Sequence, residues 1–263
     1  MKQCFSTLGC TERSLDEILA LTVKFGMGAL EVRGISNVLD NGSIPDFLPQ
    51  NLSETAKKFA DAGVIPLVLG TSCAFHDEKK YPAVWSEGTA SVDIASRLGF
   101  RGIRVFGNKI KGEESACIRR VTDGILSLCD YAKDKGVDIL LEVHGDFNTE
   151  ERLRAVVDRC GCAENFGLIW DVCHTRETYG PRWREFYHTF SRYIRHVHLK
   201  DIKDGTLVLP GEGDLPLVEM VRTLQSEGYE GWFSLEWERK WHPDLPEIEA
   251  ALKLFNDLFC ATS

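Results

Sequence analysis

The sequence has no long apolar run, no paired cysteine motif and no surplus of positive charge. None of its segments approaches the roughly 20 apolar residues of a membrane span, and its first residues include no apolar signal segment. The nine cysteines are an odd number without a C-x-x-C pair, which disfavours a disulfide framework and a zinc knuckle. The formal net charge of -9 disfavours binding to nucleic acid or to an anionic membrane. We therefore expect a cytoplasmic protein whose partner is a small molecule, and we leave homo-oligomer formation open.

Several catalytic and nucleotide-binding motifs are also absent. No G-x-G-x-x-G follows the first expected strand, and neither a Walker sequence nor a G-x-S-x-G occurs, so nothing supports a phosphate loop or a serine hydrolase. The chain also has no low-complexity segment and no domain linker. With 263 residues, of which 43% are hydrophobic, it is long enough to bury one large core. We expect a single domain over residues 1–263.

Short apolar strands alternate with amphipathic helices along the whole chain. Glycines recur where the helices are expected to end, as at Gly63, Gly99 and Gly136. The eight strands are expected at residues 3–8, 29–33, 65–69, 102–107, 138–145, 167–173, 195–201 and 231–238. An open doubly wound sheet could also hold eight strands, but a closed barrel explains why strands five to eight all carry a polar group near their C-terminal ends. The sequence therefore predicts an α/β fold, a single (β/α)8 TIM barrel.

The seventh expected strand carries three polar side chains on one face. Residues 195–201 read R-H-V-H-L-K-D, and strand alternation projects His196, His198 and Lys200 from the same side. A half-exposed strand with hydrogen-bonded histidines would explain this pattern if it stood alone. It does not stand alone, because three other strands carry a carboxylate near their C-terminal ends.

Those three carboxylates are Glu142, Asp171 and Glu236, and each follows a run of mostly apolar residues. Burying a carboxylate costs several kcal/mol unless a cation compensates its charge. Since the parallel strands of a barrel end at the same rim, these side chains and His198 are expected to meet there. The pattern predicts one divalent-metal site.

Four motifs, in this order, give the chain a family resemblance. L-L-E-V-H at 140–144, W-D-V-C-H at 170–174, H-V-H-L-K-D at 196–201 and G-Y-E-G-W-F-S-L-E-W-E at 228–238 resemble the xylose-isomerase-like TIM barrel superfamily, in particular its sugar (phosphate) isomerase/epimerase family. By that resemblance the metal ligands are Glu142, Asp171, His198 and Glu236. The resemblance, strand alternation or a loop position makes five further residues candidates for binding the substrate: His174, His144, Lys200, His76 and Glu238.

The chemistry of these residue types fits the resemblance. An oxygen-rich ligand set with open positions suits one Mn²⁺, Mg²⁺ or Co²⁺ ion better than a structural zinc site, which would use thiolates. We favour Mn²⁺ and keep Mg²⁺, Co²⁺ and Zn²⁺ as alternatives. Such an ion stabilises the enediolate that forms when a proton leaves the carbon next to a carbonyl. The resemblance implies that Glu142 and Glu236 move this proton as the catalytic pair. The alternatives are that both glutamates only bind the ion and that His174 only hydrogen-bonds to a ligand.

Three enzyme classes fit these residues. The first, which we predict, is a metal-dependent isomerase or epimerase acting on a sugar or related polyol ketone. The second is a dehydratase of the inosose or dehydroshikimate type, because the same groups can expel a β-hydroxyl. The third is a nuclease resembling endonuclease IV, but no D-x-H follows the seventh strand and the fourth strand has no histidine. A non-catalytic protein that kept the metal is a further alternative.

Two connections are candidates for covering or lining the site. Residues 35–50 are rich in Pro, Asn and Gly and are long enough to form a lid. The loop after the third strand is expected to line a substrate pocket with Phe75, His76, Tyr81 and Trp85. We interpret Arg33, which lies near a predicted loop, as a surface residue and not as an anion-binding group.

Overall fold

Eight parallel strands close into a barrel. The computed structural model describes residues 2–260, and in this part of the chain the strands pair in the closed order β1-β10-β7-β6-β5-β4-β3-β2. The barrel strands are β1 (Gln3–Ser6), β2 (Ala29–Val32), β3 (Ile65–Ala74), β4 (Gly102–Phe106), β5 (Asp138–Glu142), β6 (Phe166–Asp171), β7 (Ile194–Leu199) and β10 (Trp232–Leu235). This topology confirms the predicted (β/α)8 TIM barrel. The single domain over residues 1–263 stays a prediction, and residues 1 and 261–263 lie outside the described part.

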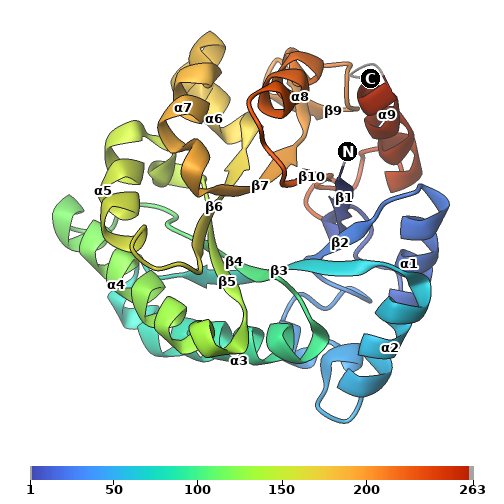
Figure 1. Ribbon diagram of the computed structural model, residues 1–263, viewed down its shortest axis with the longest axis horizontal. Coiled ribbons are helices and arrows are strands. Elements are labelled where there is room, and N and C mark those ends of the chain that lie inside the picture. Colours follow the sequence, from blue (N-terminus) through green and yellow to red (C-terminus); the bar gives the residue numbers. More distant parts are fainter. Residues whose placement is uncertain (1, 261–263) are drawn as a thin grey trace.

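Helices cover the outside of the barrel (Figure 1). They are α1 (Leu15–Lys24), α2 (Leu52–Ala62), α3 (Tyr81–Leu98), α4 (Glu114–Ala132), α5 (Glu150–Cys160), α6 (Val172–Tyr179), α7 (Trp183–Phe190), α8 (Leu217–Ser226) and α9 (Ile248–Cys260). Ser14 and Glu17 form a capping box at the start of α1. Gly63, with a φ of 66°, ends α2 in the left-handed conformation that glycine adopts without strain. None of the helices between residues 2 and 260 is long and apolar enough to cross a membrane.

One of the two connections expected to cover or line the site differs from the sequence prediction. Tyr81 and Trp85 lie on α3 and not in the loop after β3, because the helix begins at Tyr81 with a proline in its first turn, where proline is tolerated. Their rings stack on each other with centroids 6.4 Å apart. The connection over residues 35–50 is held down by Ile44 and Phe47, which are 0% and 1% exposed. Two apolar side chains thus anchor this connection in the core, and its role as a lid stays a prediction.

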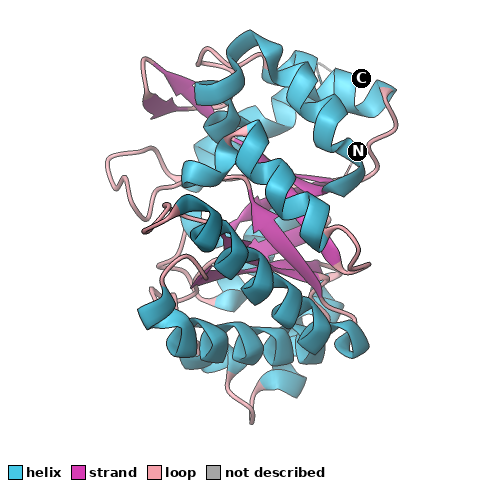
Figure 2. Cartoon of the chain, turned by 90° about the vertical axis from the view of Figure 1, so that its left-hand side faces the viewer, coloured by secondary structure: helices cyan, strands magenta, loops and turns pink. Residues whose placement is uncertain are grey.

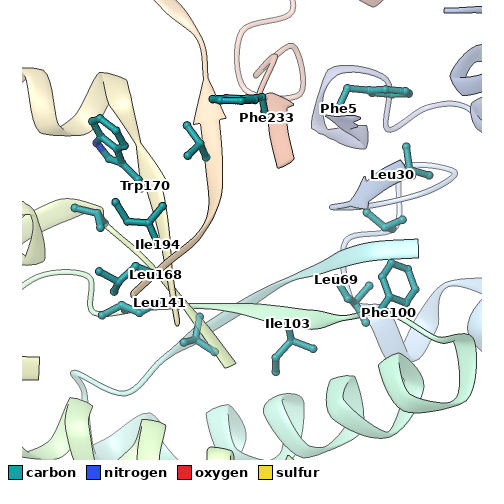
Figure 3. Close-up of a cluster of buried hydrophobic side chains, with 14 of the residues drawn as sticks. Phe5, Leu30, Leu69, Phe100, Ile103, Leu141, Leu168, Trp170, Ile194 and Phe233 are labelled. Carbon is teal, nitrogen blue, oxygen red and sulfur yellow. The ribbon is translucent and has the colours of Figure 1, made fainter. Parts of the chain in front are cut away.

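The main core lies between the barrel wall and the helices. Alternate residues of the strands point outward into this layer and meet the apolar faces of the helices. Figure 3 shows buried side chains that come from every barrel strand: Phe5, Leu30, Leu69, Ile103, Leu141, Leu168, Ile194 and Phe233. These residues are all at most 6% exposed. Because these residues point outward, the residues between them in each strand point toward the barrel axis.

The inner face of the wall changes from apolar to charged along the strands. In three strands a buried apolar residue is followed two positions later by a buried carboxylate: Ala29 and Glu31 in β2, Leu140 and Glu142 in β5, and Ile169 and Asp171 in β6. Residues two apart in a strand lie on the same face. The apolar members join one small buried cluster, which therefore fills the N-terminal end of the barrel interior. The charged side chains are gathered toward the C-terminal rim.

A hairpin follows β7 outside the barrel. Its strands β8 (Asp201–Lys203) and β9 (Thr206–Val208) pair antiparallel with each other and stand apart from the barrel strands (Figure 2). The buried carboxylate of Asp201 accepts hydrogen bonds from the backbone N–H groups of Gly211 and Gly213 at 2.9 and 3.0 Å. Asp201 thus holds the chain that leads from the hairpin to α8.

Candidate active site

The four predicted metal ligands come together at the C-terminal rim. Glu142 and Asp171 end β5 and β6, His198 lies in β7, and Glu236 directly follows β10. Each side chain offers one ligand atom, and these four atoms all lie within 4.8 Å of one another. The strand register produces this arrangement, because Asp171 pairs with His198 and His198 pairs with Ser234, two residues before Glu236. All four side chains are buried, with exposures of 0% to 3%.

The two ring nitrogens of His198 face different partners. Its Nδ1 lies 3.5 Å from Glu236 Oε1 and 4.0 Å from Glu142 Oε2, whereas its Nε2 lies 2.9 Å from an oxygen of Glu31. His198 Nδ1, Glu142 Oε2 and Asp171 Oδ2 are buried without a hydrogen-bond partner. Leaving such an atom unpaired costs about 1–3 kcal/mol. Two carboxylate oxygens and an imidazole nitrogen are also ligands of divalent ions, so these residues fit a bound divalent metal ion.

Two buried cations lie among the carboxylates. Lys200 Nζ is 2.8 Å from Asp171 Oδ2 and 2.7 Å from Glu236 Oε2. Arg104 Nη1 is 3.1 Å from Glu142 Oε2 and 3.5 Å from Glu236 Oε1. The contacts with Asp171 Oδ2 and Glu142 Oε2 are ion pairs whose geometry makes no hydrogen bond, so both oxygens still lack a donor. The chain therefore compensates part of the negative charge of the site by itself.

The two glutamates of the site have opposite pKa shifts. Burial raises the pKa of Glu142, and the charge of Arg104 only partly opposes this rise. Burial alone would also raise the pKa of Glu236, but the positive charges of Lys200 and His198 hold it well below its usual range. Burial alone would lower the pKa of Lys200, but the surrounding carboxylates raise it well above its usual value. In the metal-free protein Lys200 is charged and Glu236 is ionised.

His144 and His174 lie at the more accessible edge of the site. Their rings form an edge-to-face pair with centroids 4.2 Å apart, and each offers a nitrogen close to Glu142. Asp171 Oδ1 accepts hydrogen bonds from the backbone N–H groups of Cys173 and His174, so it caps α6. The sequence pattern predicts a strand through residue 173, but this cap starts the helix directly after Asp171. His174 therefore sits in the first turn of α6.

The remaining two candidates for binding the substrate lie differently. Glu238 bonds to Lys200 and so joins the charged group of the site. His76 is half-buried in the connection from β3 to α3, and its carbonyl oxygen accepts a hydrogen bond from Arg120. Within residues 2–260, His76 is in none of the groups whose ligand atoms lie within reach of one ion. The roles of all these side chains stay predictions.

Two buried residues of the site, Glu31 and Arg104, were not predicted from the sequence. Glu31 is 0% exposed in β2, and one of its oxygens bonds to both His196 and His198. Arg104 is 4% exposed in the apolar strand β4. The rule that a charged residue inside a buried strand needs a partner would have marked both. Arg33 was interpreted as a surface residue, which is wrong: it is 7% exposed and donates to Leu39 O and Ser72 Oγ under the connection that follows β2.

Known proteins resemble the chain in both sequence and fold. A curated relative is an inosose dehydratase from Serratia proteamaculans (strain 568), 29% identical in an alignment of 145 positions that covers 46% of this chain and 48% of that protein. Another is a fructoselysine 3-epimerase from Escherichia coli O157:H7, 29% identical in an alignment of 126 positions that covers 44% of each chain. The chain thus spans about half the length of the curated relatives it matches.

A solved structure extends the likeness of the fold to the whole chain. The IOLI protein with a binding zinc atom has a TM-score of 0.82 and 24% sequence identity, over 100% of this chain and 99% of that chain. The model of the family described as xylose isomerase-like TIM barrel matches residues 19–258. Because this match runs through nearly all of the strands and helices described above, the chain belongs to the xylose isomerase-like TIM barrel family.

Proposed function

We propose that the protein is a divalent-metal-dependent isomerase or epimerase that acts on a sugar or related polyol ketone in the cytoplasm. The observation that carries this proposal is that Glu142, Asp171, His198 and Glu236 meet at the rim. Three of their side-chain atoms, one each from Glu142, Asp171 and His198, have no hydrogen-bond partner. Active sites of TIM barrel enzymes lie at this end of the barrel. A relative named as an epimerase supports the reaction class.

The metal ion is part of the proposal. A divalent ion held by these four residues would polarise the substrate carbonyl and stabilise negative charge that develops on the neighbouring oxygens. Three carboxylates and one imidazole favour Mn²⁺, with Mg²⁺, Co²⁺ and Zn²⁺ as alternatives.

We assign the proton transfer to two glutamates of the site. Glu142 and Glu236 come from β5 and from the end of β10, and both contact the guanidinium of Arg104. One of them removes the proton next to the carbonyl, and the other returns a proton to the substrate. Lys200 forms ion pairs with Glu236 and with Glu238 and so fixes the position of Glu236. His144 and His174, at the accessible edge, bind substrate hydroxyls.

A dehydratase is the second candidate. It would share the first proton abstraction and then lose a hydroxyl from the next carbon. The relative named inosose dehydratase favours this alternative. No observation favours a nuclease, because His76 lies outside the ligand groups of the described residues and the net charge is -9.

Product mass separates these candidates. Metal-free and Mn²⁺-loaded protein would each be incubated with a panel of ketoses and inososes, and the products would be analysed by mass spectrometry. We expect a product of unchanged mass that forms only with the ion and not after chelation. A product lighter by one water would move the function to the dehydratase, and no turnover with the ion bound would contradict both.

Matched variants link the activity to the site. Glu142→Gln should abolish turnover because it removes a proposed base and ligand. Glu114→Gln is the control, since Glu114 is exposed on α4 and pairs only with Arg152 at 2.7 Å. Equal activity of the two variants would contradict the assignment.

A further inference from the structure

Glu31 is a buried carboxylate that has no role in the proposed reaction. It lies on β2, and around the barrel wall β1 and β10 separate that strand from β7. Its Oε2 atom nevertheless lies 2.9 Å from Nε2 of His196, 2.9 Å from Nε2 of His198 and 3.2 Å from Oγ of Ser234. All four residues are at most 1% exposed. One oxygen of Glu31 thus accepts three hydrogen bonds inside the barrel.

This contact decides where the hydrogen of His198 sits. An ionised carboxylate only accepts hydrogen bonds, so a ring nitrogen that bonds to it must carry the hydrogen. In His198 that nitrogen is Nε2. The ring can bind an ion only in its neutral form, and in that form its lone pair lies on Nδ1. Nδ1 is the nitrogen that faces Glu236 and Glu142, at 3.5 and 4.0 Å, without a hydrogen-bond partner.

We propose that Glu31 is the positioning residue of the metal site: by accepting the Nε2–H of His198, it holds the ring in the tautomer whose Nδ1 can bind the ion. Glu31 acts through His198 and touches neither the ion nor the substrate. A carboxylate in this relation to a ligand histidine fixes the orientation of the ring and makes it a better ligand. The inference rests on the proposed function only in taking His198 as a ligand.

Glu31 is itself held in place by the residues around it. His196, two residues before His198 in β7, donates a hydrogen bond to the same oxygen of Glu31. Ser234 donates another from the neighbouring strand β10. These two contacts give the first histidine of the H-x-H motif a structural role, which is to hold the carboxylate of Glu31. His196 positions Glu31, and Glu31 positions His198.

Metal affinity tests the proposal without any substrate. The dissociation constant for Mn²⁺ would be measured on wild type, Glu31→Gln and Glu31→Ala, with Glu249→Gln as the control. Glu249 is a partly exposed carboxylate on α9 that pairs with Arg13 at 2.8 Å, away from the barrel interior. Outer partners of ligand histidines typically contribute about 10–100-fold in affinity. For Glu31→Gln, whose amide oxygen can still accept the hydrogen bond, we expect the affinity for Mn²⁺ to fall about 10-fold. For Glu31→Ala we expect it to fall about 100-fold.

The tautomer itself is read by nitrogen NMR. In Zn²⁺-loaded, ¹⁵N-histidine-labelled wild type, His198 should show a protonated Nε2 and a metal-bound Nδ1. Folded Glu31→Ala should lose the protected Nε2–H signal, which a general loss of packing would not remove selectively. If Glu31→Ala does not fold, Glu31→Gln carries the test.

Three results would overturn the proposal: unchanged affinity in the folded Glu31 variants, metal bound through Nε2 of His198, or no ion bound by wild type. A protein that binds the ion through Nδ1 but turns over no ketose would contradict the proposed function and would leave the role of Glu31 supported.

Discussion

Lys200 and Glu236 form a buried ion pair in which Nζ lies 2.7 Å from Oε2. The other oxygen of Glu236 is left facing His198 and Arg104, at 3.5 Å from each. Both side chains are at most 4% exposed, so neither charge is screened by water. The pair therefore neutralises Glu236 in part and orients it at the same time.

Replacing Lys200 by methionine should destabilise the metal-free protein. The change leaves Asp171, Glu236 and Glu238 without their shared cation, and removing one partner of a buried ion pair typically costs about 3–5 kcal/mol. Urea unfolding of the metal-free protein measures this free energy.

The control is Lys111→Met. Lys111 pairs with Asp77 at 2.7 Å, but its side chain is 53% exposed, and such pairs contribute about 0–1 kcal/mol. If the two variants had the same free energy of unfolding, Lys200 would not have the stabilising role described here.

Metal content tests the ligand set. Wild type should retain about one divalent ion per chain after dialysis, and Glu236→Gln or His198→Ala should retain much less, because each removes one of the four proposed ligands. Elemental analysis of the dialysed proteins measures this. Full occupancy in both variants would refute the assignment, and three ions per chain would revive the nuclease hypothesis.

Thiol reactivity tests the burial of the cysteines. Cys162 and Cys260 are exposed, whereas burial raises the pKa of Cys10, Cys73, Cys129, Cys160 and Cys173 to about 12 and that of Cys4 well above its usual value. Only the thiolate reacts, so these six stay protonated and unreactive at pH 8, and burial keeps the reagent from Cys117. Native protein should show two fast thiols with a disulfide reagent, and unfolded protein all nine. Rapid reaction of five or more thiols in folded protein would contradict the packing of the core.

The fold could be predicted because its signals are local. Alternating strands and amphipathic helices, with glycines such as Gly63 at the helix ends, repeat along the chain. The boundaries that were missed depend on single residues. Pro82 allows α3 to begin at Tyr81, and the carboxylate of Asp171 caps α6 at once.

The site could be predicted only in part, because several of its contacts join strands that lie far apart in the sequence. Glu142, Asp171 and Glu236 each end an apolar strand run, so their shared place at the rim follows from the barrel. Glu31 bonds to His198 across 167 positions of sequence, and no local pattern indicates that contact. The same holds for Arg104, whose two glutamate partners lie on β5 and after β10.

Isotope incorporation tests the central claim, proton transfer by Glu142 and Glu236, most directly. The metal-loaded protein would be incubated with its ketose substrate in D₂O, and the product would be analysed by mass spectrometry and NMR. We predict one deuterium on the carbon next to the carbonyl, with all hydroxyls kept. Isomerisation without deuterium would indicate a hydride shift within the substrate and would contradict the roles of both glutamates.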